Sequence, residues 1–243
     1  MYQTFYYLGN QNGSMLTVFH NGKKKKEARR IWTTLFTLIT FLSLTASTTH
    51  SGDRIRILVL GDSLTAGYGL KKQDAFPVKL EATLNAQGHA VKVNNAGVSG
   101  DTTAGGLARL DWALANKPQM VILELGANDG LRGLNPLDTK ANLNAILRRL
   151  KHQKIAVLLT GMLAPPNLGK EYGQEFNRIY GDLAKLHGIP LYAFFLEGVA
   201  NQPHLNQKDG IHPNPEGVDV IVTGILPKVT ALLENLNSIK GNP

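Results

Sequence analysis

The sequence predicts an α/β fold built on a mostly parallel sheet, and three observations lead to this class. Apolar runs that fit strands alternate along the chain with segments of helical spacing. The first run, Ile57-Leu58-Val59-Leu60, has no polar alternation, which is typical of a strand buried on both faces of a parallel sheet. Polar and glycine-rich motifs follow the apolar runs, as expected at the carboxyl ends of parallel strands.

Apolar runs and proline positions set the expected strands and the first helices. Pro77 can open the helix after the first strand, and Gly88 is expected to end it. Pro118 is expected to close the helix before the third strand. The expected strands cover residues 55–60, 90–93, 120–125, 155–159 and 189–194.

Further helices are expected from apolar spacing and capping residues. One has its apolar residues three and four positions apart and ends before Gly188, a candidate C-cap. Another is expected to begin with Asp138 as its N-cap, and the last with Asn214 as N-cap before Pro215. The apolar stripe of the first of these comprises Tyr172, Phe176, Ile179, Leu183 and Leu186.

The chain of 243 residues divides by composition into a leader, residues 1–50, and a single domain, residues 51–243. The domain is long enough to bury a full hydrophobic core. The leader holds six Lys and Arg against one Glu, out of a formal net charge of +8, which leaves 20 bases and 17 acids in the domain. The basicity therefore belongs largely to the leader, and no aromatic-rich basic stripe supports nucleic-acid binding.

The leader has the composition of a secretory signal peptide. A basic run, residues 23–30, precedes an apolar stretch, residues 31–44, and then small residues up to Ser47. The apolar stretch is short for a membrane span, which needs about 20 residues. We therefore expect export to the periplasm or the medium, with cleavage near Ser47. The alternatives are a later start at Met15 and an uncleaved anchor, which would be the protein's contact with a membrane.

The absence of cysteine excludes disulfides, thiolate nucleophiles and thiolate metal sites. Four histidines, His89, His152, His187 and His204, lack the spacing of metal ligands. These residues therefore indicate no metal site, and no cofactor is expected.

The chain is organised around the motif GDSLTAGYGL, residues 61–70. Ser63 stands where the chain turns out of the sheet, the place at which chemistry collects in open α/β folds. It is a candidate nucleophile. A serine after a strand is more often a helix N-cap or a turn residue, which is the alternative here.

Two further motifs follow strands and offer hydrogen-bond donors. In NNAGVSGDT, residues 94–102, Gly97 lets the backbone approach a ligand and present its N–H. In ELGAND, residues 124–129, Asn128 can donate from its side-chain amide. The alternatives are an ordinary loop and helix start for the first motif and an Asx turn for the second.

The motif DGIHPNP, residues 209–215, is the most informative. Pro213 restricts His212 to extended backbone. Asp209, three residues earlier, can accept from the His212 Nδ1–H, which leaves Nε2 free to take a proton from a hydroxyl. The alternative is an exposed histidine in a proline-rich turn with an unrelated aspartate.

With these motifs the sequence resembles the SGNH family of GDSL hydrolases, and within it the bacterial multifunctional esterases of thioesterase I, lysophospholipase and arylesterase type. The resemblance covers residues 54–236 and contains the family motifs in order. The family fold implies a flavodoxin-like, three-layer α/β/α sandwich with a five-stranded parallel sheet. The matching motifs are GDSLTAGYGL, NAGVSGDTTAGG, LGANDGLRG and DGIHPNPEG.

The resemblance implies a serine hydrolase that works through an acyl-enzyme. It assigns Ser63 as the nucleophile, His212 as the general base and Asp209 as the partner of the base. The oxyanion hole would consist of the Ser63 N–H, the Gly97 N–H and the Asn128 amide.

The resemblance also makes the segment after Asn128 a wall of the acyl pocket, with Leu131 and Leu134 as its apolar surface. The alternative is that both leucines pack into the core. The expected substrates are small acyl esters, thioesters and lysophospholipids, and the expected state is a monomer.

Two rival functions stay open. SGNH hydrolases also deacetylate sugars, so a carbohydrate acetylesterase is one alternative. The other is a non-catalytic module that binds an anion on the loop of residues 97–106. The order Ser…Asp…His, without G-x-S-x-G, argues against an α/β-hydrolase.

Overall fold

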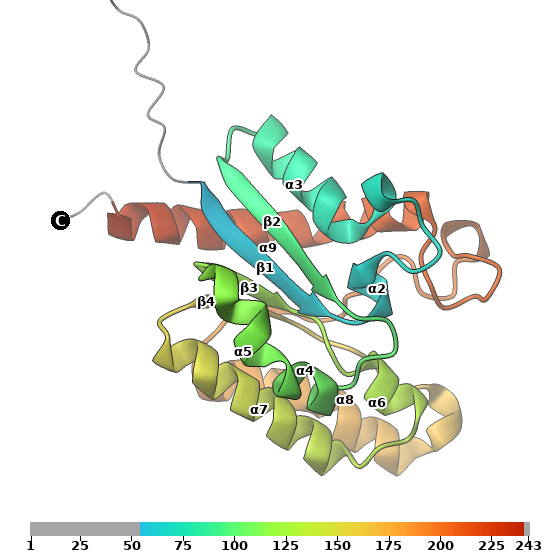
Figure 1. Ribbon diagram of the computed structural model, residues 1–243. Helices are drawn as coiled ribbons and strands as arrows, with labels where there is room; N and C mark the ends of the chain where they lie inside the picture. Colours follow the sequence, from blue (N-terminus) through green and yellow to red (C-terminus); the bar gives the residue numbers. More distant parts are fainter. Residues whose placement is uncertain (1–53, 241–243) are drawn as a thin grey trace, which may run out of the picture. The chain divides into compact units, whose positions relative to one another are not determined.

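A five-stranded parallel sheet carries the motifs along the edge formed by the carboxyl ends of its strands. The computed structural model describes residues 54–240, so the predicted leader, residues 1–50, lies outside the described residues. The strand order is β2-β1-β3-β4-β5, and every neighbouring pair is parallel (Figure 1). The strands are β1 (Ile55–Gly61), β2 (Val91–Gly97), β3 (Met120–Leu123), β4 (Ala156–Thr160) and β5 (Leu191–Tyr192).

Helices cover both faces of the sheet, as Figure 1 shows. On one face α3 (Phe76–Ala86) packs against α9 (Pro215–Lys240). On the other α7 (Pro136–His152) lies between α4 (Thr103–Ala108) and α8 (Lys170–His187). The predicted three-layer fold is confirmed. The shorter elements are α2 (Ser63–Ala66), α5 (Leu110–Ala113), α6 (Ala127–Leu131), η1 (Lys72–Asp74), η2 (Leu114–Asn116), η3 (Pro166–Leu168) and η4 (Pro203–Leu205).

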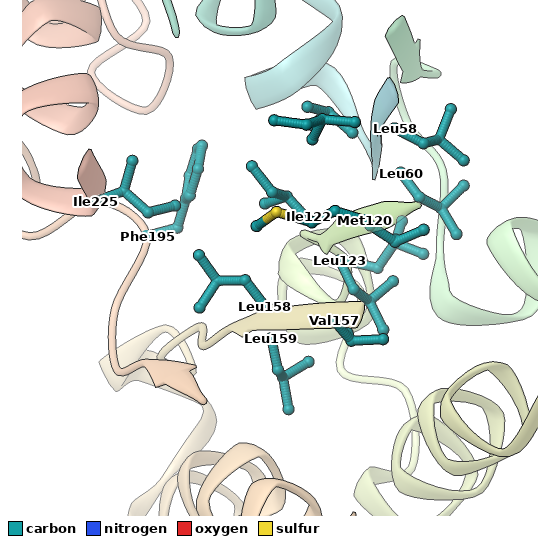
Figure 2. Close-up of a cluster of buried hydrophobic side chains, with 14 of the residues drawn as sticks. Leu58, Leu60, Met120, Ile122, Leu123, Val157, Leu158, Leu159, Phe195 and Ile225 are labelled. Atoms are coloured by element: carbon teal, nitrogen blue, oxygen red, sulfur yellow. The ribbon is translucent and has the colours of Figure 1, made fainter. Parts of the chain in front are cut away.

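The central strands form the core between the two helix layers. All residues of β3 are buried, and in β1 only Arg56 is partly exposed. Successive side chains point to opposite faces, so an unbroken apolar run supplies both layers at once (Figure 2). The edge strand β2 instead alternates buried and exposed positions. β1, the strand that leads to Ser63, therefore belongs to the buried centre of the sheet.

Three predicted strand boundaries are wrong. β2 continues to Gly97 because it stays in register with β1 up to the pair Gly61 and Gly97. β3 ends at Leu123, two residues early, so that Glu124 lies beyond the strand. β5 has two residues rather than six, because it is an edge strand that pairs with β4 at Leu191 and Tyr192. The apolar residues around it serve packing rather than pairing.

Helix caps agree with the sequence in two places and differ in one. Asn214 caps α9 by accepting from the Gly217 N–H at 2.9 Å, and Gly188 ends α8 with a φ of 65°. The predicted cap at Asp138 is wrong. Asn135 caps α7 instead, accepting from the Leu137 N–H at 2.9 Å, because Pro136 already occupies the first helical position.

The predicted apolar stripe of α8 is wrong at its end, where Leu186 is 67% exposed. Tyr180 and Ala184 are buried instead, so the buried face is centred away from Leu186. None of the helices in the described part of the chain is long and apolar enough to cross a membrane.

Candidate active site

Ser63 is the first residue of the one-turn helix α2, just beyond the carboxyl end of β1. The residue before it, Asp62, is the N-cap of this helix, and its Oδ1 accepts from the Leu64 N–H at 3.0 Å. Gly67, with a φ of 85°, ends the helix after that turn. Because Asp62 fills the capping role, the Ser63 hydroxyl is available for another partner.

Close packing requires glycine at the end of β1. A Cβ on Gly61 would lie 2.6 Å from Glu124 Oε2 and 2.7 Å from the Glu124 carbonyl oxygen, and it would also meet Thr65 Oγ1. A side chain at Gly61 would therefore displace the turn that carries Ser63.

The structure brings together Ser63, His212 and Asp209. Ser63 Oγ lies 3.0 Å from His212 Nε2, and His212 Nδ1 lies 2.8 Å from Asp209 Oδ2. An ionised carboxylate can only accept, so the imidazole proton belongs on Nδ1 and Nε2 accepts from the serine hydroxyl. This is the arrangement in which a histidine can act as a base toward a serine.

The loop that carries His212 is fixed by its own backbone. The His212 carbonyl accepts from the Gln207 N–H at 2.8 Å, and the Asn214 N–H donates to the Leu205 carbonyl at 2.9 Å. Asn206 and Pro213 form an antiparallel bridge between these two bonds. The imidazole is therefore positioned before any substrate binds.

Asp209 is held as an anion by the loop that contains it. Burial acts to raise its pKa, but the backbone N–H groups of His212 and Ile211 and the His212 ring donate to the carboxylate and lower the pKa of Asp209 to about 2. Each backbone donor lies 3.0 Å from Oδ1. The carboxylate is thus ionised at neutral pH and can stabilise a protonated His212.

Tyr68 is a site residue that the sequence did not single out. Its ring lies against the His212 ring, with centroids 4.6 Å apart and planes tilted by 37°. Tyr68 is nevertheless 52% exposed. It therefore forms an exposed aromatic wall beside the imidazole. The signal available in the sequence was its place within GDSLTAGYGL.

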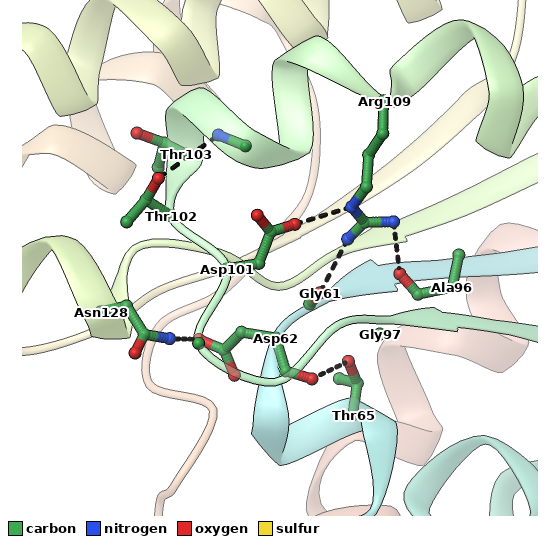
Figure 3. Close-up of polar contacts among 12 residues, drawn as sticks. Gly61, Asp62, Thr65, Ala96, Gly97, Asp101, Thr102, Thr103, Arg109 and Asn128 are labelled. Carbon is green, nitrogen blue, oxygen red and sulfur yellow. Dashed lines mark hydrogen bonds and ion pairs between the residues drawn. The ribbon is translucent and has the colours of Figure 1, made fainter.

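Asn128 joins the site through Asp62. It lies on α6 after Gly126, whose φ is 116°, and its Nδ2 donates to Asp62 Oδ2 at 3.1 Å (Figure 3). The alternative of an Asx turn does not describe this side chain, because its amide contacts the residue next to Ser63 rather than its own backbone. Its position supports the predicted role as a donor.

Gly97 does not have the free donor that the sequence led us to expect. Its N–H already donates to Asn95 Oδ1 at 2.8 Å. A Cβ on Gly97 would lie 2.8 Å from Ala66 Cα, which shows that this glycine packs beneath α2. Glycine is needed here for close contact between strand and helix, and in this geometry its N–H is occupied.

A pair of buried acids lies beneath Ser63. Asp62 and Glu124 are both fully buried, and the Asp62 N–H donates to Glu124 Oε2 at 3.2 Å. Burial raises the pKa of Asp62 to about 6, against the hydrogen bonds from Leu64 and Asn128. Burial and the neighbouring Asp62 charge raise the pKa of Glu124 well above its usual range.

Arg109 fastens the ends of β1 and β2 together. Its guanidinium donates to the Gly61 carbonyl at 2.9 Å, to the Ala96 carbonyl at 2.7 Å and to Asp101 Oδ2 at 2.6 Å (Figure 3). The planar fork of arginine suits three acceptors at once. The clamp holds the Ser63 turn and the following loop in one arrangement, and nothing local in the sequence indicated it.

A second fastening joins that loop to α6. The Asp129 side chain accepts from the Thr103 N–H at 2.9 Å and from Thr139 Oγ1 at 3.2 Å. Arg132, just after α6, donates to the Gly100 carbonyl at 2.7 Å. The turn around Gly100 is therefore held next to the helix that carries Asn128.

Leu131 and Leu134 do not pack into the core. Leu131 is 54% exposed and Leu134 is 39% exposed, and the Leu134 carbonyl accepts from the Tyr172 hydroxyl at 2.8 Å. The alternative of two core leucines is therefore wrong. Both leave apolar surface open on the segment that begins with Asn128.

Within residues 54–240, no three His, Asp or Glu side chains gather as ligands for a metal ion. His187, one of the histidines considered above, has its Nε2 2.7 Å from Asn144 Oδ1.

The fold and the site together define a class: an α/β hydrolytic enzyme with a serine, a histidine and an aspartate at the carboxyl edge of a parallel sheet. A family model for the GDSL-like lipase/acylhydrolase family matches residues 59–220. The chain belongs to this family and is an ester hydrolase, which confirms the resemblance seen in its motifs.

The relatives agree with this assignment. Esterase TesA of Pseudomonas aeruginosa is 40% identical over 178 residues, which are 73% of this chain and 89% of the relative. A protein of Escherichia coli K12 named thioesterase 1/protease 1/lysophospholipase L1 is 38% identical over 196 residues, 80% of this chain and 93% of the relative. Among solved structures, AlinE4, an SGNH-hydrolase family esterase, is 48% identical with a TM-score of 0.63, covering 75% of this chain and 98% of that one.

Proposed function

We propose that this protein hydrolyses carboxylic esters and thioesters of acyl chains, lysophospholipids among them, through an acyl-enzyme on Ser63. The observation that carries the proposal is the continuous hydrogen-bonded chain from Ser63 through His212 to Asp209. The names of the relatives include esterase, thioesterase and lysophospholipase, which supports this range of substrates.

The geometry supports a two-step mechanism. His212 Nε2 takes the hydroxyl proton as Ser63 Oγ attacks the acyl carbonyl carbon, and Asp209 stabilises the imidazolium that forms. The imidazolium then gives its proton to the leaving alkoxide or thiolate as the bond to the acyl carbon breaks. Water, deprotonated by His212, attacks the acyl-enzyme, and the acid leaves as Ser63 regains its proton.

The negative oxygen of each tetrahedral intermediate needs preorganised donors. The Ser63 N–H and the Asn128 amide are two of them. For the third, we place the donor at Gly100 rather than at Gly97, whose N–H is occupied by Asn95. Gly100 is exposed, its carbonyl is held by Arg132 beside α6, and none of the described residues accepts from its N–H.

The exposed leucines support an apolar wall for the acyl chain. Leu131 is the last residue of α6, which also carries Asn128, and Leu134 follows three residues later. A wall of this kind gains free energy with each methylene that it buries, at about 0.8 kcal/mol. Medium-chain substrates are therefore expected to be hydrolysed with a higher kcat/KM than acetyl esters.

A substrate panel tests the proposal. kcat/KM is measured for p-nitrophenyl esters from acetyl to dodecanoyl, for acyl-CoA thioesters, for lysophosphatidylcholine and for acetylated xylan. A serine-directed phosphonate should label the wild type at Ser63 and leave Ser63→Ala unlabelled. Faster cleavage of acetylated xylan would favour the carbohydrate acetylesterase, and absence of labelling would favour the binding module.

The composition of residues 1–50 supports export as part of this proposal, with the domain acting as a monomer in the periplasm or the medium. N-terminal sequencing of the exported protein should begin near Ser47 to Ser51. Recovery of the intact leader on protein in the cytoplasm would contradict export, and recovery of the intact leader at the membrane would favour the anchor.

A further inference from the structure

Asp62 lies between the proposed nucleophile and one of its proposed oxyanion donors. One carboxylate oxygen accepts from the Leu64 N–H at 3.0 Å, and the other accepts from Asn128 Nδ2 at 3.1 Å. We infer that Asp62 is a positioning residue of the oxyanion hole, which sets the direction of the Asn128 amide relative to Ser63. This inference rests on the proposed function.

The two hydrogen bonds explain why a carboxylate is buried here. A carboxylate presents acceptors on both of its arms, whereas an asparagine presents one acceptor and one N–H₂ donor. With asparagine at position 62, either Leu64 N–H or Asn128 Nδ2 would face another donor. Burying a charge is costly. An aspartate is nevertheless suited to this position because it supplies two acceptor oxygens at once.

The direction of the Asn128 amide matters because its two ends differ in charge. With Nδ2 turned to Asp62, one of its N–H groups is used and the second is left to donate to an acyl oxygen. If the amide turned over, its carbonyl oxygen would face the developing oxyanion and repel it. Asp62 accepts only from the nitrogen end and so selects the productive orientation.

Glu124 supports Asp62 from below. It lies just beyond β3, and its own N–H donates to the Leu60 carbonyl at 2.8 Å. Its Oε2 accepts from the Asp62 N–H at 3.2 Å, and its buried Oε1 has no partner among the described residues. Glu124 thus holds the backbone of Asp62 and leaves both Asp62 carboxylate oxygens to Leu64 and Asn128.

A merely structural role for Asp62, as the cap of α2, makes a different prediction. Serine is also a good N-cap, but its side chain is too short to reach Asn128 while it caps. Asp62→Ser therefore keeps the cap and removes the positioning contact. Asp62→Asn keeps the shape and removes the second acceptor, and it serves as a second variant if Asp62→Ser does not fold.

The test is a double-mutant cycle on a medium-chain p-nitrophenyl ester. We expect Asp62→Ser and Asn128→Ala each to lower kcat about 10²- to 10³-fold with KM changed less than about threefold, since each removes one oxyanion donor from its place. The double variant should be within about threefold of Asn128→Ala alone, because an absent amide cannot be misplaced. Losses that multiply, or a Asp62→Ser protein with normal kcat, would overturn the inference.

Asp129→Asn is the matched control. Asp129 is buried and adjacent to Asn128, but its side chain binds Thr103 and Thr139 instead of the Asn128 amide. Its loss should multiply with that of Asn128→Ala. If it does not, the cycle reports general disorder of the site and the inference fails. Failure of the proposed function is distinguishable, because then Ser63→Ala would keep the activity of the wild type.

Discussion

Two aspartates flank Ser63, and the fold treats them in opposite ways. Asp209 lies in a partly exposed loop, with its side chain 37% accessible, and three donors lower its pKa to about 2. Asp62 is fully buried between the sheet and α2, and burial raises its pKa to about 6 although two donors face it. The residue type is the same, but the balance between desolvation and hydrogen bonding is reversed.

The difference matches the two tasks. In the proposed mechanism Asp209 must stay ionised while a positive charge appears and disappears on His212, so partial exposure and several hydrogen bonds suit it. The proposed task of Asp62 is to hold two donors in fixed directions, which a rigid, dry environment does better. Each variant below removes or reverses one side of this comparison.

The largest loss of kcat is expected when the nucleophile or the base, which the two aspartates serve, is removed. Ser63→Ala and His212→Ala should each lower kcat on the order of 10⁴- to 10⁶-fold, because the members of such a unit act together. The measurement is ester hydrolysis at saturating substrate by protein whose fold is verified by circular dichroism. Substantial turnover by folded Ser63→Ala would refute the serine mechanism.

Asp209→Asn should rank next. An asparagine amide can donate to Nδ1, which places the imidazole proton on Nε2 and leaves no base facing Ser63, so a loss of about 10³- to 10⁴-fold in kcat is expected. KM for the same ester should change little. A loss smaller than that of Asp62→Ser would reverse the proposed ranking of the two aspartates.

The opposite pKa shift of Asp62 predicts a signed effect on stability. Its folded-state pKa of about 6 exceeds the ordinary value of 3.8, so ionising Asp62 destabilises the fold as the pH rises from about 4 to 7. Asp62→Ser removes this loss. As the pH rises over this range, the free energy of unfolding of Asp62→Ser should therefore increase relative to that of the wild type. The increase should reach about 3 kcal/mol, since each pKa unit is worth about 1.4 kcal/mol.

Urea denaturation at several pH values measures this difference. Glu124, His212 and Asp101 are the titratable groups that face Asp62, so the pH dependence of Asp62→Ser is compared with that of Glu124→Gln as well. Parallel pH dependences of wild type and Asp62→Ser would show that Asp62 is not the titrating group.

The smallest effect on activity is expected at the proposed acyl wall, away from both aspartates. Leu134→Ala should lower kcat/KM for octanoyl esters about three- to tenfold relative to acetyl esters, because the leucine is partly exposed and loses only part of its methylene contacts. The chain-length profile of the variant is compared with that of Leu137→Ala, a control at an exposed leucine of α7. Equal profiles would remove Leu134 from the pocket.

The sequence predicted the fold best where burial is complete. β1 and β3 were found because strands buried on both faces are continuous apolar runs. β5 was found but predicted too long, since the apolar residues at 189–194 pack against the core while only Leu191 and Tyr192 pair with β4. Apolar composition reports burial, and strand pairing needs a partner that composition does not identify.

The same contrast holds within the site. Asp209 and His212 were paired in advance because three residues and a proline determine their geometry locally. Gly97 was predicted to have a free N–H. In the structure this N–H donates to the Asn95 side chain, a hydrogen bond that the sequence of the loop does not reveal. Tyr68 lies inside the GDSLTAGYGL motif, but its contact with His212 could not be foreseen because the two residues lie near opposite ends of the domain.

By itself the sequence determined the family and the parallel α/β sheet, and it singled out Ser63, Asp209, His212 and Asn128 as candidate site residues. The tertiary structure alone decided how those groups are aimed. Asp62 meets Glu124 and Asn128 across more than 60 residues of chain, and Arg109 reaches Gly61 across 48. Such contacts form only when strands that are distant in sequence lie side by side. The orientation and the charge state of a side chain such as Asp62 therefore depend on neighbours that the local sequence does not contain.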